Sequence, residues 1–285
     1  MKKIDQYNRL YLLFNLSYHD ICLMLSLPSE IFTERFFCYL PFSSVLEFLT
    51  INKQLRNKLL DKIKINKHMI VQQEMLTHWY YPNLTHITTH FRYLPQYVEK
   101  LIFDDHFDLP LGPLPHSITH LTFGYIFNQS IKGILPPSLK ELTFGTGFNK
   151  PIKEEISVSH KHVLSYIPST VTRLMFGESF NQDIRGAIPP TVTHLAFMGS
   201  FDQNIHNKIP SLVTTLILPC NSPYYIENIE SILPNSIKEF ILGTYIYEKN
   251  ADGLFYLAPD RHFSDYRYRS RHISPYPNHY GTGVQ

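Results

Sequence analysis

The chain has 285 residues, with 26 Lys or Arg against 24 Asp or Glu, so its formal net charge is only +2. This balance excludes a general electrostatic attraction to nucleic acid or to an anionic membrane. Hydrophobic residues make up 44% of the chain, which is enough to build a core and excludes a chain that is disordered throughout.

The three cysteines of the chain indicate its cellular compartment. Cys22, Cys38 and Cys220 form neither a disulfide framework nor the paired spacing of a zinc site. We therefore expect reduced thiols and a protein of the cytoplasm or nucleus. No run of 18 apolar residues occurs, so no membrane-spanning helix is predicted. Residues 1–24 are predicted to be an N-terminal extension without a secretory signal, because no small-residue cleavage site follows their short apolar stretch.

Residues 25–65 have the spacing of a small helical domain. Ser29 can cap a helix that buries Phe32 and Phe36 and that ends at Pro41. Two further runs with apolar residues at helical spacing follow it. The pattern predicts a module of three helices.

This stretch resembles an F-box. The resemblance begins at the Leu-Pro-Ser-Glu-Ile segment and ends near Arg56, although the Cys and Trp of the usual Val-Cys-Lys-x-Trp stretch are missing. It implies docking on the Skp-type subunit of a cullin-RING (SCF-type) ubiquitin ligase. The docking residues that the resemblance implies are Leu27, Pro28, Ile31, Val45 and Leu46. The alternative is that these apolar residues only hold the helices together and let them cap the repeats that follow.

Residues 66–93 are predicted to form a linking helix. Met69, Met75 and Trp79 are among its apolar residues. Such a helix would cap the open end of a stacked array, where a bare apolar face would otherwise meet water.

A repeat of about 21 residues occupies residues 94–246. Leu-Pro or Ile-Pro pairs mark its units, and their prolines lie 20, 21, 32, 21, 21 and 24 residues apart. The pairs are Leu94-Pro95, Leu114-Pro115, Leu135-Pro136, Ile167-Pro168, Ile188-Pro189, Ile209-Pro210 and Leu233-Pro234. The long interval predicts an insertion at residues 153–166.

Each unit carries two further anchors. The first is Leu-x-Phe, usually followed by Gly, as in the LTFG segment that ends at Gly124. The second is Phe-Asn-x-x-Ile, as in Phe127-Asn128 with Ile131. The unit at residues 209–221 lacks Phe-Gly and Phe-Asn, and the last unit keeps only part of the first anchor. Terminal repeats often diverge in this way, so we expect a C-terminal cap.

A unit of this length cannot bury its apolar residues alone, so neighbouring units must stack. Leu-x-Phe alternates as a half-buried strand does, and stacked strands would pair in parallel at ~4.8 Å per turn. The Gly after Phe is expected to supply a positive φ in a turn. The Asn or Asp after the second Phe is expected to form a ladder from turn to turn.

These units resemble the FNIP repeat, a relative of the leucine-rich repeat, and in that family F-box segments precede such repeats. The fold class that we expect is therefore mixed α and β, with a three-helix F-box-like module followed by a parallel LRR-like β-solenoid. The resemblance implies a non-enzymatic adaptor that presents a target protein to an SCF-type ligase, which would be the host's ligase if the protein is viral. The alternative is a protein-interaction scaffold without ligase docking.

Target binding is expected on the outward positions of the strands, because the inward positions must form the core. These positions are His120, Thr122, Glu141, Thr143, Arg173, Met175, His194 and Ala196. Their mixed charge and partly apolar character suit a protein better than a phosphate backbone. Any one of them alone fits ordinary solvated surface better than a binding hot spot.

No motif for chemistry is present. The chain has no Walker-type glycine loop, no Gly-x-Ser-x-Gly elbow and no HExxH segment. Its 15 histidines include His116 and His120, as well as His160 and His162 in the insertion, but no thiol or carboxylate spacing completes a metal site. We therefore expect no catalytic residue, no cofactor and no metal.

Two segments leave alternatives open. The insertion at 153–166 is either a partner-binding loop or a tolerated excursion. Residues 247–285 are predicted to be a C-terminal cap followed by a basic, aromatic tail. Arg267, Arg269 and Arg271 alternate with tyrosines, as in segments that bind single-stranded nucleic acid. The prolines and short length of the tail instead favour a loosely packed terminus.

Overall fold

The computed structural model describes residues 65–77, 84–155, 163–219, 225, 229 and 232–258. The chain divides into two compact units, of which one comprises Met1–Ile87 with Tyr93–Val98 and the other comprises Thr88–Arg92 with Glu99–Gln285. Each unit is described by itself.

The linking helix predicted for residues 66–93 is wrong. Residues predicted to form a linking helix instead form strand β1 (Ile65–Ile70), a 3-10 helix (Gln73–Thr77) and strand β2 (Leu84–Thr89). Strand β2 reads LTHITT, and its side chains are buried at five of its six positions. The β-branched threonines and isoleucine favour an extended chain, and burial on both faces removes the alternation that marks a strand in sequence.

The predicted fold class, mixed α and β with an N-terminal three-helix module, is therefore wrong as stated. No three-helix module lies in the part of the chain that the structure describes, where β-strands dominate. The F-box-like module was predicted on residues 25–65, of which 25–64 lie outside the described residues.

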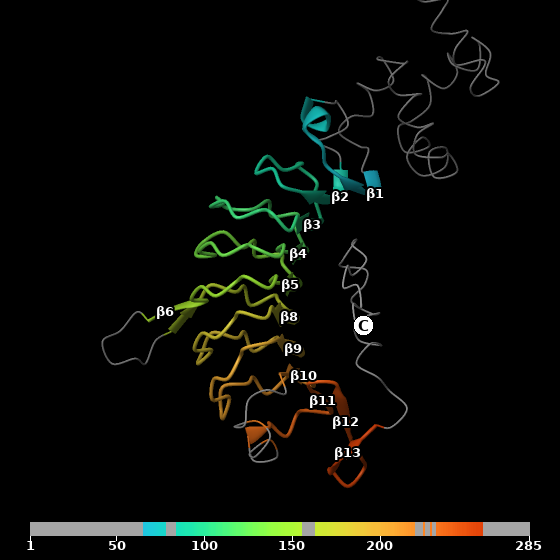
Figure 1. Ribbon diagram of the computed structural model, residues 1–285, viewed down its shortest axis with the longest axis vertical. Helices are drawn as coiled ribbons and strands as arrows, with labels where there is room; N and C mark the ends of the chain where they lie inside the picture. The colour runs from blue at the N-terminus through green and yellow to red at the C-terminus, as the bar shows by residue number, and fades with distance from the viewer. Residues whose placement is uncertain are drawn as a thin grey trace, which may run out of the picture. The chain divides into compact units, whose positions relative to one another are not determined.

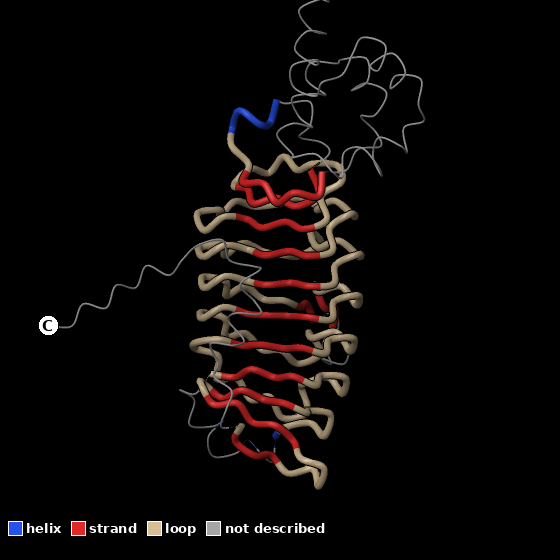
Figure 2. The backbone as a smooth tube through the Cα atoms, turned by 90° about the vertical axis from the view of Figure 1, so that its right-hand side faces the viewer, coloured by secondary structure: helices blue, strands red, loops and turns tan. Residues whose placement is uncertain are grey.

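The second unit is the β-solenoid that the repeat predicted. Successive turns contribute one parallel strand each, and the rungs stack in a regular column (Figures 1 and 2). These strands are β3 (Lys100–Phe103), β4 (His120–Thr122), β5 (Glu141–Thr143), β8 (Arg173–Phe176), β9 (His194–Phe197), β10 (Thr215–Leu218) and β11 (Glu239–Leu242). Leu121 pairs with Leu142 and Leu142 with Leu174, so equivalent residues of each unit lie directly over one another.

Stacked phenylalanines fill the interior of the solenoid. In a middle turn, Phe144 lies 4.0 Å from Phe148, ring centroid to centroid. Between turns, Phe144 lies 5.5 Å from Phe123, and Phe148 lies 6.2 Å from Phe127, with nearly parallel rings. Two ring columns therefore run through the core, as the two anchors of the repeat predicted. Each fully buried ring contributes about 2–3 kcal/mol through removal of apolar area from water.

Tyr225 continues the second ring column in the diverged unit, whose sequence lacks the Phe-Asn anchor. This side chain is fully buried, and its ring lies 6.4 Å from that of Phe201. Its hydroxyl donates a hydrogen bond of 2.7 Å to the carbonyl of Gln203, which satisfies the polar end of the ring. The diverged unit therefore replaces its missing Phe with Tyr from a displaced position.

The glycine after Leu-x-Phe is required by close approach and not by a positive φ, contrary to the expectation from sequence. Among the described glycines, positive φ occurs at other positions of the repeat, for example at Gly133 and Gly186, and directly after the strand motif it occurs only in the diverged last unit, at Gly243. A Cβ built on Gly124 would overlap the backbone carbonyl of Asp104, and one on Gly145 would overlap that of Gly124. At Gly124 and Gly145, the close approach of the preceding turn therefore leaves no room for a side chain.

The predicted ladder of Asn and Asp side chains is confirmed. The backbone N–H of Asn128 donates to Oδ1 of Asp108 at 2.8 Å, and that of Asn149 donates to Oδ1 of Asn128 at 3.0 Å. The same bond joins Asn181 to Asn149 at 3.0 Å and Asp202 to Asn181 at 3.3 Å. Each turn thus satisfies a backbone donor of the next one, which ties the return arcs together.

Two antiparallel features interrupt the regular stack. The insertion contributes strands β6 (Lys153–Glu155) and β7 (Val163–Ser165), which pair with each other as a separate hairpin. At the C-terminal end, β12 (Tyr245–Lys249) pairs antiparallel with β11, and β13 (Phe255–Leu257) pairs antiparallel with β12. This reversal of direction ends the parallel ladder. No helix among the described residues is long and apolar enough to cross a membrane.

Candidate protein-binding face

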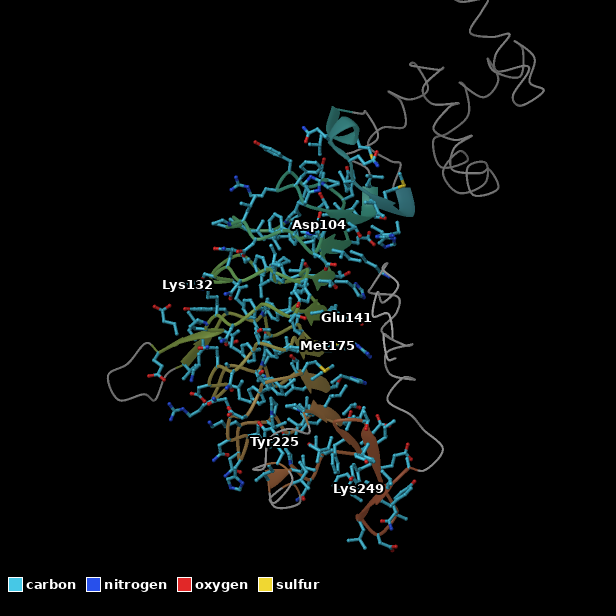
Figure 3. All side chains as sticks on the ribbon, in the orientation of Figure 1. Asp104, Lys132, Glu141, Met175, Tyr225 and Lys249 are labelled. Atoms are coloured by element: carbon cyan, nitrogen blue, oxygen red, sulfur yellow. The ribbon has the colours of Figure 1, made fainter. Side chains whose placement is uncertain are left out.

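The outward face of the parallel strands consists of two columns of side chains. The first column, here called the polar column, comprises Lys100, His120, Glu141, Arg173, His194, Thr215 and Glu239. The second, here called the graded column, comprises Ile102, Thr122, Thr143, Met175, Ala196, Ile217 and Ile241. Figure 3 shows Glu141 and Met175 on this strand side and Lys132 at the opposite edge, on the return arcs.

The structure brings all eight predicted target-binding residues onto this one face. His120, Glu141, Arg173 and His194 are consecutive members of the polar column. Thr122, Thr143, Met175 and Ala196 are consecutive members of the graded column. Residues that lie about 20 to 30 positions apart in the sequence therefore become neighbours at the strand spacing of ~4.8 Å. Their role in target binding stays a prediction.

Glu141 lies between two basic side chains of the polar column, His120 and Arg173. Its carboxylate lies 3.8 Å from Nε2 of His120 and 3.6 Å from Nε of Arg173. The side chains of His120 and Glu141 are 38% and 33% exposed, so these pairs are screened by water and contribute little to stability. These three side chains offer a protein partner a surface on which acidic and basic groups alternate.

The surroundings of His194 favour its neutral form. Burial lowers the pKa of this histidine, the charge of Arg173 lowers it further, and Glu141 acts in the opposite direction. Nδ1 of His194 also lies 2.9 Å from the hydroxyl of Thr193. A neutral imidazole next to an arginine presents a hydrogen-bonding group without adding positive charge.

After its first member, Ile102, the graded column changes from polar to apolar along the solenoid. Thr122 and Thr143 are partly exposed, whereas Ile217 and Ile241 are 8% and 0% exposed. Ala196 is also buried, so it does not offer the accessible surface that the sequence predicted. Sequence reasoning omitted Ile217 and Ile241 from this face. The segments TLIL and EFIL nevertheless carry a signal for burial on both faces, because the third residue of each, at an outward position, is apolar.

A second cluster of charges lies on the return arcs and fixes the insertion hairpin. Nζ of Lys153 lies 2.6 Å from the carboxylate of Asp183, and Nζ of Lys208 lies 3.0 Å from it. Burial opposes ionisation of Asp183, but the hydrogen bonds from Lys153 and Lys208 outweigh it and hold the pKa of this carboxyl well below its usual range. Ser165 also donates a hydrogen bond of 2.6 Å to the carbonyl of Ala187. The base of the insertion is thus part of the scaffold.

The described residues do not form a metal site. No set of three His, Cys, Asp or Glu side chains in these parts of the chain is placed to hold a metal ion. The implied docking residues Leu27, Pro28, Ile31, Val45 and Leu46 lie outside the described residues, as do His160, His162 and the tail arginines Arg267, Arg269 and Arg271.

Comparison with known proteins supports the repeat. The family model for the FNIP Repeat matches residues 88–126, 127–157 and 164–200, so the chain contains FNIP repeats. The matched residues include β3, β4, β5, β8 and β9, and they end before the diverged units.

One solved structure is described as "The crystal structure of CroV588 a novel circular LRR protein structure". It is 26% identical to this chain, with a TM-score of 0.40, and the match covers 57% of this chain. The match covers 31% of that protein, so this chain corresponds to less than a third of its length. The comparison with curated proteins finds no match.

Proposed function

We propose that this chain is a non-enzymatic protein-interaction scaffold whose outward strand face binds a target protein. The observation that supports this proposal is the in-register stacking of the polar and graded columns from β3 to β11. Six strand spacings of ~4.8 Å make a continuous face about 29 Å long. Repeat solenoids of this type use such extended faces for binding.

The chemistry of the face fits a protein surface. Charges of both signs alternate along the polar column, so a partner with the complementary order would be selected by charge. The adjacent graded column offers threonine hydroxyls and the Met175 side chain, which is polarisable and adapts to irregular surfaces. A face of one sign, which would suit a nucleic acid backbone, is not what these residues form.

Photo-crosslinking would test the proposal. A photoreactive amino acid at Thr143, in the centre of the face, should crosslink a protein that co-purifies with the chain, whereas the same group at Lys150, an exposed residue on the return arcs, should not. Reversing two charges with Glu141→Arg and Arg173→Glu should abolish co-purification of that protein. Lys150→Glu is the matched control and should leave it unchanged.

Equal crosslinking from Thr143 and Lys150, or full binding by the charge-reversed variant, would exclude this face as the binding site.

A narrower role as the substrate adaptor of an SCF-type ubiquitin ligase is supported by the F-box resemblance at residues 25–65. It requires the chain to bind a Skp-type subunit through Leu27 and Pro28. Co-expression followed by size-exclusion chromatography should give a one-to-one complex that Leu27→Ala with Pro28→Ala dissociates. A monomer of unchanged circular dichroism would remove the ligase role and leave the scaffold. The proposal places the protein in the cytoplasm or nucleus, where such a subunit is available.

A further inference from the structure

Arg173 presents a guanidinium on the outward strand face that makes no hydrogen bond within the described residues. Its side chain is 49% exposed, and its Nε lies 3.6 Å from the carboxylate of Glu141, which is longer than a hydrogen bond. The two other arginines of the described ranges each donate one, Arg92 to a backbone carbonyl and Arg185 to a carboxylate. All five N–H donors of Arg173 are therefore left for a ligand.

Glu141 positions this guanidinium without saturating it. The same carboxylate oxygen, Oε1, lies 3.8 Å from Nε2 of His120 and 3.6 Å from Nε of Arg173, so two basic side chains share one acidic group. Ion pairs this long and this exposed are weak. Because Glu141 approaches Arg173 most closely at Nε, the edge formed by the two Nη nitrogens remains for a second carboxylate. This edge is a two-nitrogen fork that binds both oxygens of a carboxylate side by side.

His194 borders Arg173 on the side away from Glu141 and adds a hydrogen-bond donor. It is the register partner of Arg173 in the next strand. The hydroxyl of Thr193 lies 2.9 Å from Nδ1 of His194 and 3.2 Å from the carbonyl of Thr172. We assign the hydroxyl proton to the shorter contact, which leaves the ring proton of the neutral histidine on Nε2. An anion bound to Arg173 can therefore accept a second hydrogen bond from His194.

Met175 places an apolar side chain at a fixed distance from Arg173. Both residues belong to β8, and alternate residues of a strand project from the same face about 6.6 Å apart. Met175 is half-buried and is the register partner of Thr143. An extended segment of a partner also spaces its alternate side chains by about 6.6 Å. An acidic and an apolar side chain two positions apart in such a segment would therefore reach Arg173 and Met175 together.

A carboxylate suits this position better than a phosphate group does. A phosphorylated side chain carries a charge of about −1.5 to −2, whereas a carboxylate carries a single negative charge. The negative charge of Glu141 beside Arg173 opposes the phosphate more strongly. The register partners of Arg173 are Glu141 and His194, so no second arginine or lysine adjoins it in the polar column, whereas phosphate-binding sites commonly use arginine clusters.

We propose that Arg173 is the anchor of the target-binding face and takes a carboxylate from an extended, acidic protein segment, with an apolar residue two positions away lying against Met175. This inference rests on the proposed function, because it names the class of partner that the same face binds. Two parallel N–H···O bonds from a guanidinium to a carboxylate fix the orientation of the bound group as well as its affinity. Arginine is also among the residues that dominate binding energy at protein interfaces.

Selection from a displayed library of random peptides would test the proposal. The full natural chain and the full-length variant Arg173→Gln are used as bait in parallel. Peptides selected by the natural chain should carry Asp or Glu two positions from an apolar residue, and Arg173→Gln should lose this enrichment. Lys150→Gln removes a positive charge from the exposed return arcs, so it is the matched control and should keep the enrichment.

Affinities of one selected peptide would then identify the contact. Replacing its acidic residue by the corresponding amide should weaken binding to the natural chain by about ten-fold or more, and should not change binding to Arg173→Gln. The change in the peptide needs no protein variant, so it holds whatever the variants do. Arg173→Lys keeps the charge but loses the fork, and should bind several-fold more weakly than the natural chain. Phosphoserine in place of the acidic residue should also weaken binding.

The proposal is overturned if no peptide is selected, if the selected peptides lack an acidic residue, or if Arg173→Gln selects the same peptides. Full binding by Arg173→Lys also overturns it, because a point charge would then suffice. Tighter binding of the phosphoserine peptide would make the site one for phosphate. None of these outcomes changes the crosslinking expected at Thr143, so the scaffold role can stand when the carboxylate site fails. Loss of crosslinking at Thr143, in turn, leaves the peptide result unaffected.

Discussion

Replacing Phe148 by Ala should divide the solenoid at its middle. Phe148 is fully buried, and its ring lies 6.2 Å from Phe127 in the turn before and 6.1 Å from Phe180 in the turn after. It also lies 4.0 Å from Phe144 within its own turn. The substitution therefore removes three ring contacts at once and leaves a cavity that rigid neighbouring turns cannot close.

The expected cost follows from burial and cavity formation. Buried Phe→Ala substitutions destabilise proteins by about 3–5 kcal/mol, and the lack of room for collapse places this one at the upper end. Because each turn contacts only its neighbours, the loss acts on two interfaces, Phe127 with Phe148 and Phe148 with Phe180. We expect a loss of about 4–5 kcal/mol in the free energy of unfolding.

Urea denaturation followed by circular dichroism and by tyrosine fluorescence would measure this loss. With a slope of about 2 kcal/mol per molar urea, the midpoint should fall by roughly 2 M. Lys150→Ala, an exposed change two residues away, is the matched control and should shift stability by less than about 0.5 kcal/mol. A loss below about 1 kcal/mol for Phe148→Ala, with the cooperative transition retained, would refute a continuous ring column as the main support of the fold.

Three further changes test other parts of the scaffold. Gly145→Ala should lower the melting temperature by several degrees, because the new Cβ overlaps the carbonyl of the preceding turn, whereas Gly112→Ala meets no atom within 4 Å and should be neutral. Asn149→Ala removes the acceptor for two hydrogen bonds from the next turn and should cost about 1–2 kcal/mol in urea denaturation, while Asn149→Asp, which keeps the acceptor, should cost less. Asp183 has a pKa below its unfolded value, so its contribution to stability is present above about pH 4 and is lost as the pH falls through its folded pKa. The difference in melting temperature between the natural chain and Asp183→Asn should therefore shrink below about pH 4, and a constant difference would contradict the ion pair with Lys153.

The repeat could be predicted from sequence because its physics is local and periodic. Leu121 and Phe123 recur at a fixed interval, and identical residues at identical positions can only be buried by stacking. The same argument predicted the ladder through Asn149, since a short polar side chain in a repeated turn meets the backbone of the next turn. It also predicted that Glu141 and Arg173 share the outward face, where they are register partners in neighbouring strands.

Predictions about single, non-repeated segments failed where local preference was ambiguous. The apolar residues at positions 66–93 fit a helix by spacing, but Leu84–Thr89 is buried on both faces as a strand. Short apolar runs of this kind cannot be assigned by periodicity, and pairing with neighbouring strands decides the outcome.

The sequence alone therefore determined the period of the repeat, the parallel direction of the strands and the residues of the core columns, because each unit repeats the same pattern of residues. The tertiary structure decided what depends on distance between units. It assigned Gly124 to close approach of backbones, brought Lys153 and Lys208 to Asp183, and buried Ile217 on an outward face. These features arise from groups that are remote in the chain, and only the stacking of turns in space brings them within contact distance.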